Sequence, residues 1–196
     1  MSDELDALRK EIAELRATVQ HLKDVHEIND VFFKWHFDCT GGFKGKQAGR
    51  PEALECLTED AEIDVSPNPP GKGPKGREEY TEFWDYFYGD NGPLPYVFQT
   101  SAADKVEIHP DGNTATQYSN MLGIFQARGG QPTIGLNQRI NTFRRTPEGW
   151  RICKTTIEGG LSSTLTAGLN PNGLNELPPQ EERVPFHIRK YGNNPA

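Results

Sequence analysis

His36 has the side chain best suited to acid–base chemistry in this sequence, and it lies between Trp35 and Phe37 in a stretch with helical spacing of apolar residues. The pKa of a histidine lies near neutrality unless burial shifts it, so His36 is a candidate proton acceptor. The alternative is a buried histidine bonded to a neighbouring backbone, and the sequence leaves both open. Asp38 is turned about 200° away from His36 on a helix, so the two are not expected to form a dyad.

Polar side chains recur at alternate positions in two later segments that have the composition of strands. Tyr118 and Asn120 share one face of the first segment, and Arg139 and Asn141 share one face of the second. Tyr118 is a candidate hydrogen-bond donor or acid, Arg139 a candidate catalytic cation, and the two asparagines are candidate substrate-binding residues. Alternation does not show which face lines a site and which lies outside, so both placements stay open.

A buried arginine requires a partner for its charge. For Arg139 this partner would be an anionic oxygen of a ligand or an internal carboxylate such as Asp64 or Glu107. The two alternatives imply different roles, because only the first makes Arg139 a binding residue.

Some of these candidate residues, such as His36, must be positioned by helices in the first half of the chain. Residues 2–24 predict a helix with two rows of apolar residues seven apart, which are Leu5, Ile12 and Val19, and Leu8, Leu15 and Leu22. These rows have to be buried against the same domain or against another subunit, and both remain open. The helical spacing continues with a broader apolar surface as far as Cys39, before Gly41-Gly42, and a helix that is apolar nearly all round is expected to be buried.

Two shorter helices and a series of strands are expected after this first helix. The helices are predicted at residues 51–57 and 77–88, and the strands at 60–65, 96–108, 114–126, 134–145 and 150–157. Helices followed by long antiparallel strands indicate an α+β fold. The expected organisation is an N-terminal amphipathic helix at 1–24, an α+β domain at 25–160 and an extended C-terminal tail at 161–196.

Composition and charge argue against several classes of partner. The chain has 196 residues and a formal net charge of −7, and an acidic protein lacks the basic face that a nucleic acid requires. Its three widely spaced cysteines fit neither a disulfide framework nor a zinc site, and no stretch reaches the ~20 apolar residues of a membrane span. We therefore expect no metal, no nucleic acid, no membrane and a reducing, cytoplasmic location.

Four stretches at residues 27–40, 57–61, 106–115 and 143–152 carry a resemblance to a known family. The first contains Trp35-His36-Phe37-Asp38-Cys39-Thr40, and the last begins with Phe143 and ends with Ile152. In this order and spacing they resemble the SnoaL-like family of the nuclear-transport-factor-two-like superfamily, over about residues 20–160. The resemblance implies a cone-shaped fold, with three helices packed on a strongly curved antiparallel sheet enclosing one pocket, and it implies no cofactor.

The sequence departs from the dehydratases of that family at the residues that matter for their chemistry. The resemblance would place a Tyr and an Asp on the first long helix and a His on the strand after the third helix. The matching positions hold Trp35, Thr40 and Gln99. Dehydration by a His–Asp dyad is therefore not expected, and Trp35 and Gln99 become candidate substrate-binding residues.

The leading interpretation is a cofactor-independent lyase or isomerase that acts on a small aromatic or polycyclic substrate by acid–base chemistry in an enclosed pocket. His36, Tyr118 and Arg139 are its catalytic candidates. Some relatives in the superfamily act on lignin-derived diaryl compounds and release formaldehyde, which suggests a more specific substrate. The alternative is a non-catalytic small-molecule-binding or assembly protein. A homo-oligomer, dimer or trimer, is expected because both chain ends need surfaces that bury their apolar residues.

Overall fold

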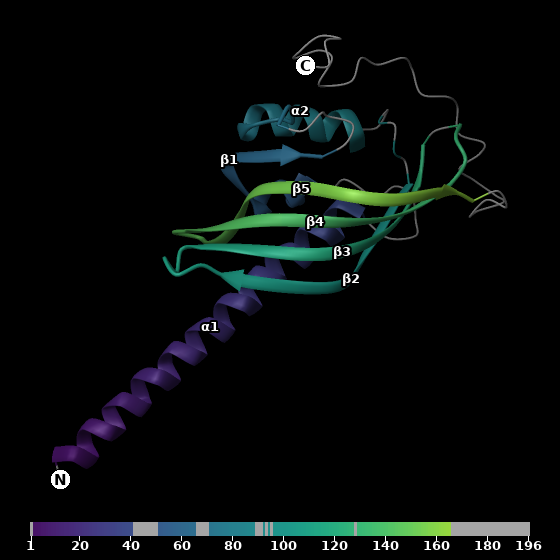
Figure 1. Cartoon of the computed structure of the whole chain (residues 1–196). Helices are drawn as coiled ribbons and strands as arrows, with labels where there is room; N and C mark the ends of the chain where they lie inside the picture. The colour runs from purple at the N-terminus through teal and green to yellow at the C-terminus, as the bar shows by residue number, and fades with distance from the viewer. Residues whose placement is uncertain are drawn as a thin grey trace.

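The computed structural model describes residues 2–40, 51–65, 71–88, 92, 94, 96–127 and 129–165. Most of the expected C-terminal tail lies outside these residues. Helices and strands follow one another in the expected order (Figure 1). The elements are α1 (Ser2–Thr40), the 3-10 helix η2 (Pro51–Cys56), β1 (Leu57–Asp64), α2 (Gly76–Tyr88), β2 (Tyr96–Ile108), β3 (Thr114–Gln126), β4 (Thr133–Thr146) and β5 (Gly149–Thr164). Strand β5 continues past the boundary expected at residue 160, because its last residues pair with the start of β4.

The described strands form one curved sheet in the order β1-β5-β4-β3-β2. Strands β2 to β5 are an antiparallel meander, as expected. Strand β1 instead runs parallel to β5, so the sheet is mixed and not wholly antiparallel. A short hairpin turn forces antiparallel pairing, and β1 is free of that constraint because it is far from β5 in the chain. The α+β fold with three helices on a curved sheet is confirmed.

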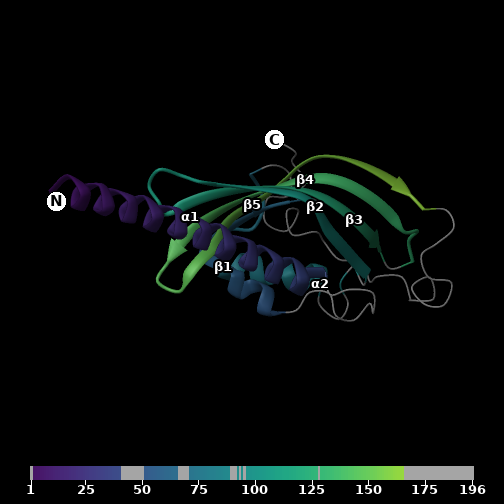
Figure 2. The same ribbon diagram turned by 90° about the horizontal axis from the view of Figure 1, so that it is seen from below.

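The second half of α1 lies across one face of the sheet, where it packs against β2, β5 and η2 (Figure 2). Ile28 and Phe32 of α1 are fully buried there, together with Phe143 of β4 and Ile152 of β5. Burial of each such side chain contributes about 1.5–3 kcal/mol. This packing fixes one face of α1 against the inner face of the sheet, and α2 covers β1 beside it.

The outer side of α1 does not follow the expectation of a helix buried all round. Phe33 and Phe37 are 51% and 63% exposed among the described residues, since only one face of the helix meets the sheet. The first half of α1 projects beyond the sheet altogether (Figures 1 and 2).

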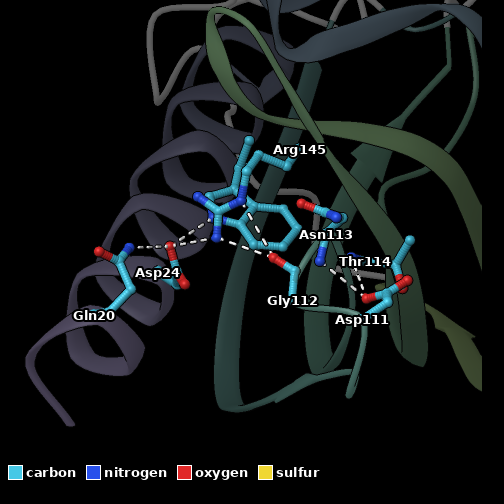
Figure 3. Close-up of polar contacts among 8 residues, drawn as sticks. Gln20, Asp24, Asp111, Gly112, Asn113, Thr114 and Arg145 are labelled. Atoms are coloured by element: carbon cyan, nitrogen blue, oxygen red, sulfur yellow. Dashed lines mark hydrogen bonds and ion pairs between the residues drawn. The ribbon is translucent and has the colours of Figure 1, made fainter. Parts of the chain in front are cut away.

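A polar cluster joins α1 to the hairpins of the sheet at the point where the helix leaves the domain (Figure 3). The buried carboxylate of Asp24 accepts hydrogen bonds from Gln20 Nε2 at 3.0 Å and Trp150 Nε1 at 3.2 Å, and it forms a 2.8 Å ion pair with Arg145. The Arg145 guanidinium also lies 4.4 Å from the Trp150 ring centre and donates to Gly112 O. Burial raises the pKa of Asp24, but these hydrogen bonds outweigh it and hold the pKa below its ordinary value.

Candidate active site

The alternation of β4 directs Arg139 to the inner face of the sheet. Arg139 is 6% exposed, Asn141 and Phe143 are fully buried, and the intervening Gln138 is exposed. Because side chains of a strand point alternately to its two faces, this burial pattern places the Arg139–Asn141 face on the side that α1 covers.

Arg139 meets three other residues that sequence analysis selected, from two further elements. Its Nη1 lies 3.3 Å from His36 Nε2, and its Nη2 donates to Gln99 Oε1 at 3.2 Å. The guanidinium carbon is 5.0 Å from the centre of the Trp35 ring, a cation–π distance. We call this set, formed by Trp35, His36, Gln99 and Arg139, the Arg139 cluster.

In the part of the chain that the structure describes, the positive charge of the cluster has no carboxylate beside it. Among the described residues, none forms an ion pair with Arg139. The two internal carboxylates proposed for this role lie elsewhere: Asp64 accepts from the backbone of Gly71 at 2.9 Å, and Glu107 pairs with Lys105 at 2.5 Å. Neither of these carboxylates is therefore paired with Arg139, and the other alternative, an anionic oxygen of a ligand, stays open. Within the same described part of the chain, Arg139 Nε and Trp35 Nε1 are buried without a hydrogen-bond partner, which is costly for buried polar atoms.

His36 is held as a neutral imidazole. Burial, and secondarily the charge of Arg139, place the pKa of His36 well below its ordinary value of 6.5. A guanidinium only donates hydrogen bonds, so Nε2 of His36 accepts from Arg139 and the ring proton belongs on Nδ1. Burial also lowers the pKa of Arg139, but an arginine remains cationic at neutral pH. The cluster therefore combines a permanent cation with an uncharged base.

Two residues that sequence analysis did not assign to the site, Tyr88 and Cys39, lie within electrostatic reach of Arg139. Burial raises the pKa of the Tyr88 hydroxyl and of the Cys39 thiol, and the Arg139 charge opposes both rises. Both groups consequently stay protonated at neutral pH. Tyr88 ends an aromatic-rich helix, and this composition was the one signal in the sequence that pointed towards it.

Tyr118 and Asn120 do not join the Arg139 cluster. The neighbouring Gln117 and Ser119 are fully buried, so the alternation of β3 turns Tyr118 and Asn120 to the opposite, outer face. There Asn120 Oδ1 accepts from Gln138 Nε2 at 3.3 Å. The two residues share one face, as expected, but it is not the face that meets α1.

Asn141 lies on the inner face, in a chain of side-chain amides. Its Nδ2 donates to Gln117 Oε1 at 3.1 Å, and Gln117 Nε2 donates to Asn29 Oδ1 of α1 at 3.3 Å. These bonds connect β4, β3 and α1 next to the Arg139 cluster. Asn141 thus has a structural role in holding the helix on the sheet, although its buried Oδ1 has no partner among the described residues.

A hollow of about 440 Å³ lies at the surface of the sheet, and no residue of the Arg139 cluster lines it. It is lined by residues of β3, β4 and β5: Asn120, Met121, Leu136, Asn137, Gln138, Gly160 and Leu161. Leu136 and Leu161 are 50% and 75% exposed, so this hollow is an outer feature beside the irregular pairing at Leu136–Gln138. Gln99 of the Arg139 cluster and the nearby Tyr88 are partly exposed.

The described residues contain no group of three or more His, Cys, Asp or Glu side chains that could hold a metal ion. In the same part of the chain, no helix is both long enough and apolar enough to span a membrane.

Several solved structures are similar to this one. A protein provisionally described as a scytalone dehydratase from Novosphingobium aromaticivorans has 17% sequence identity and a TM-score of 0.62, covering 80% of this chain and 97% of its own. A type 2 hexachlorocyclohexane dehydrochlorinase has 14% identity and a TM-score of 0.64, covering 80% of this chain and 99% of its own. The type 3 hexachlorocyclohexane dehydrochlorinase from Novosphingobium barchaimii has 13% identity and a TM-score of 0.63, covering 79% of this chain and 99% of its own. At these identities the similarity shows the fold.

A search of the curated proteins finds no match to the chain. The family model of the SnoaL-like domain, by contrast, matches residues 20–156, which is most of the chain and includes all four residues of the Arg139 cluster. With the fold described above, this match shows that the chain belongs to the SnoaL-like family.

Proposed function

We propose that this protein is a cofactor-independent lyase or isomerase that binds a small aromatic or polycyclic molecule at the Arg139 cluster and removes a proton from it. One observation carries the proposal: the buried Arg139 cation has no carboxylate partner among the described residues and lies against a neutral histidine. An oxygen that is anionic, or becomes so during the reaction, would supply the missing negative charge.

The proposed roles follow from the hydrogen-bond capacity of each group. A substrate oxygen that accepts from Arg139 Nη1 replaces His36 as acceptor, which frees the Nε2 lone pair of His36 to take a proton from the substrate. Tyr88, kept protonated by burial, is the proposed donor to a leaving group or to a second substrate oxygen. Tyr118 is not included because it lies on the outer face.

The surroundings of the cluster favour an aromatic substrate. The Trp35 ring lies against Arg139, the Phe32 ring meets His36 edge-on at 4.7 Å, and the Trp84 and Tyr88 rings are 4.6 Å apart. Planar apolar walls with a few convergent polar groups suit a ring-bearing ligand. The names of the similar structures, a dehydratase and dehydrochlorinases, denote eliminations of water or hydrogen chloride, which supports a lyase reaction.

A lignin-type diaryl compound is the specific substrate we propose to test first. In a 1,2-diarylpropane-1,3-diol, a base takes the proton of the terminal hydroxyl, and the carbon–carbon bond to that CH2 group breaks to release formaldehyde. The electron pair of the broken bond forms the new double bond, and the other hydroxyl leaves as water with a proton from an acid. The products are a stilbene, formaldehyde and water, so no oxidant is required.

The test is to incubate the full chain with such a diol and follow stilbene absorbance and formaldehyde. We expect both products, with turnover lost in His36→Gln and Arg139→Met and retained in Tyr118→Phe, which changes the outer face only. Absence of both products from the wild-type protein would reject the diaryl substrate. Equal turnover in wild type and Arg139→Met would reject the site itself.

The second candidate function is binding without catalysis. It is favoured by Trp35 and Thr40, which stand at the helix positions where the resemblance to dehydratases of the family would place Tyr and Asp. Native mass spectrometry with a panel of aromatic acids and phenols separates the two functions. A ligand that is retained unchanged, and that His36→Gln still binds, would support a binding protein.

A further inference from the structure

The projecting half of α1 carries a continuous apolar stripe that nothing covers among the described residues. We call it the heptad seam, and its members are Leu5, Leu8, Ile12, Leu15, Val19 and Leu22. Each is between 48% and 61% exposed, and this part of the helix stands clear of the sheet in Figures 1 and 2. A helix of this length depends on packing of its apolar face for most of its stability, so the seam requires a partner.

The seam faces away from the domain that carries it. At about 100° per residue, the seam is centred about 170° around the helix axis from the buried residues Asp24, Ile28 and Trp35. The ion pair between Asp24 and Arg145 holds α1 in this orientation where it leaves the sheet. A second helix can therefore lie along the seam while both domains stay on the outside of the pair.

The residue types in the seam match a two-stranded parallel coiled coil. Written as a heptad abcdefg, position a holds Leu5, Ile12 and Val19, and position d holds Leu8, Leu15 and Leu22. Branched residues such as Ile and Val at a, combined with Leu at d, favour two parallel strands.

The charged residues that flank the seam also favour a parallel orientation of the two helices. Position g holds Glu4 and Glu11, and position e of the following heptad holds Arg9 and Arg16. In a parallel, in-register pair, each g residue faces the e residue of the next heptad on the partner helix, which sets Glu4 opposite Arg9 and Glu11 opposite Arg16. In an antiparallel pair g faces g and e faces e, so the same residues would repel.

From this arrangement we propose that residues 4–23 bind the same residues of a second copy of this chain as a parallel, in-register, two-stranded coiled coil. The dimer carries its two SnoaL-like domains on opposite outer sides of the helix pair. Phe33, two heptads beyond Val19, is half exposed, but the position between them holds the exposed His26, so the apolar row is interrupted there.

Disulfide trapping tests the register and orientation in the full-length protein. Leu8→Cys places a thiol at d, where the two copies meet, and Lys10→Cys places one at f, two residues later on the outside. Under a mild oxidant, Leu8→Cys is expected to form a covalent dimer at least about tenfold faster than Lys10→Cys. The wild type controls for the native thiols, of which Cys39 and Cys56 are buried and Cys153 is partly buried.

Charge exchange tests the flanking pairs. The double variant Arg9→Glu with Arg16→Glu is expected to raise the dissociation constant of the dimer at least about tenfold, measured by analytical ultracentrifugation over a range of protein concentrations. Adding Glu4→Arg and Glu11→Arg is expected to restore the dimer. The wild type should sediment at twice the chain mass of 21.9 kDa. The proposal would be overturned if the two cysteine variants were trapped at equal rates, or if the protein were a trimer or a monomer whose seam is covered by its own tail. It would also be overturned if the variant with all four charges exchanged failed to form dimers again. None of these outcomes depends on the ligand site.

Discussion

Arg139 of β4 donates a hydrogen bond to His36 of α1 at 3.3 Å, so a permanent cation and an uncharged base are in direct contact and both are buried. The Arg139 charge is a secondary cause of the low pKa of His36, after burial. Such an arrangement costs folding free energy in the absence of a counter-charge, and that cost makes the site testable through stability as well as through binding.

Replacing Arg139 with methionine is expected to increase stability while it removes ligand binding. Arg139→Met keeps an unbranched apolar stem, although a shorter one, and removes a buried charge that has no carboxylate partner among the described residues, so we expect the free energy of unfolding to rise by about 1 kcal/mol or more. Urea denaturation measures this change. Arg144→Met is the matched control on the same strand, because Arg144 is partly exposed and pairs with Asp60. Greater destabilisation by Arg139→Met than by Arg144→Met would argue that Arg139 is structural.

His36 is expected to make the protein less stable as the pH falls below 6.5. In the unfolded chain the imidazole binds a proton near its ordinary pKa of 6.5, whereas the folded state holds that pKa well below this value. The unfolded state then binds more protons, and the free energy of unfolding falls by up to about 1.4 kcal/mol per pH unit below 6.5. Urea denaturation at about pH 7.5 and about pH 5 measures the difference.

The variant His36→Gln should lose that pH dependence and keep an acceptor for Arg139. His26→Gln serves as its control on the same helix, since His26 is largely exposed and pairs with Asp30. If wild type and His36→Gln respond equally to pH, His36 does not provide the proton linkage.

The contact between Asp24 and Arg145 is expected to stabilise the attachment of α1 to the sheet. Asp24→Asn removes the charge of a buried carboxylate that accepts two hydrogen bonds, from Gln20 and Trp150, and pairs with Arg145. We expect this change to lower the free energy of unfolding by about 1–3 kcal/mol. Asp30→Asn, an exposed change on the same helix, should be close to neutral. A double-mutant cycle with Arg145→Met should give a coupling energy of about 1–2 kcal/mol. Additive effects would show that the two residues act independently.

Gly73 is expected to tolerate no side chain. A Cβ at this position would lie 1.8 Å from the backbone oxygen of Ile63 in β1, whereas one at Gly130 would make ordinary contacts of 3.4 Å or more with Ala127. Gly73→Ala should therefore lower the unfolding free energy by more than about 2 kcal/mol, because backbone must shift, and Gly130→Ala should change it little. Thermal denaturation of the two variants decides this, and equal melting temperatures would contradict it.

The amino-acid sequence determined the order of the elements and the pairs of residues that share a face. Apolar residues at helical spacing predicted the helices, and the Gly, Pro and Asn turns predicted the limits of the four antiparallel strands, because these signals are local. The resemblance covering Trp35 and His36 also predicted the fold, and the alternation in β4 correctly paired Arg139 with Asn141.

Only the tertiary structure decided which of two faces became the inside. In β3 the fully buried side chains include the polar Gln117 and Ser119, and Tyr118 turns outward, because α1 packs on one side of the strand. A hydrogen bond from Gln117 to Asn29 of α1 offsets part of the cost of burying a polar group. A period of two is symmetric with respect to the two sides of a strand, so sequence alternation carries no information on which side a distant helix will cover. The approach of Tyr88 to Arg139 and the parallel pairing of β1 with β5 likewise depend on contacts between residues far apart in the chain.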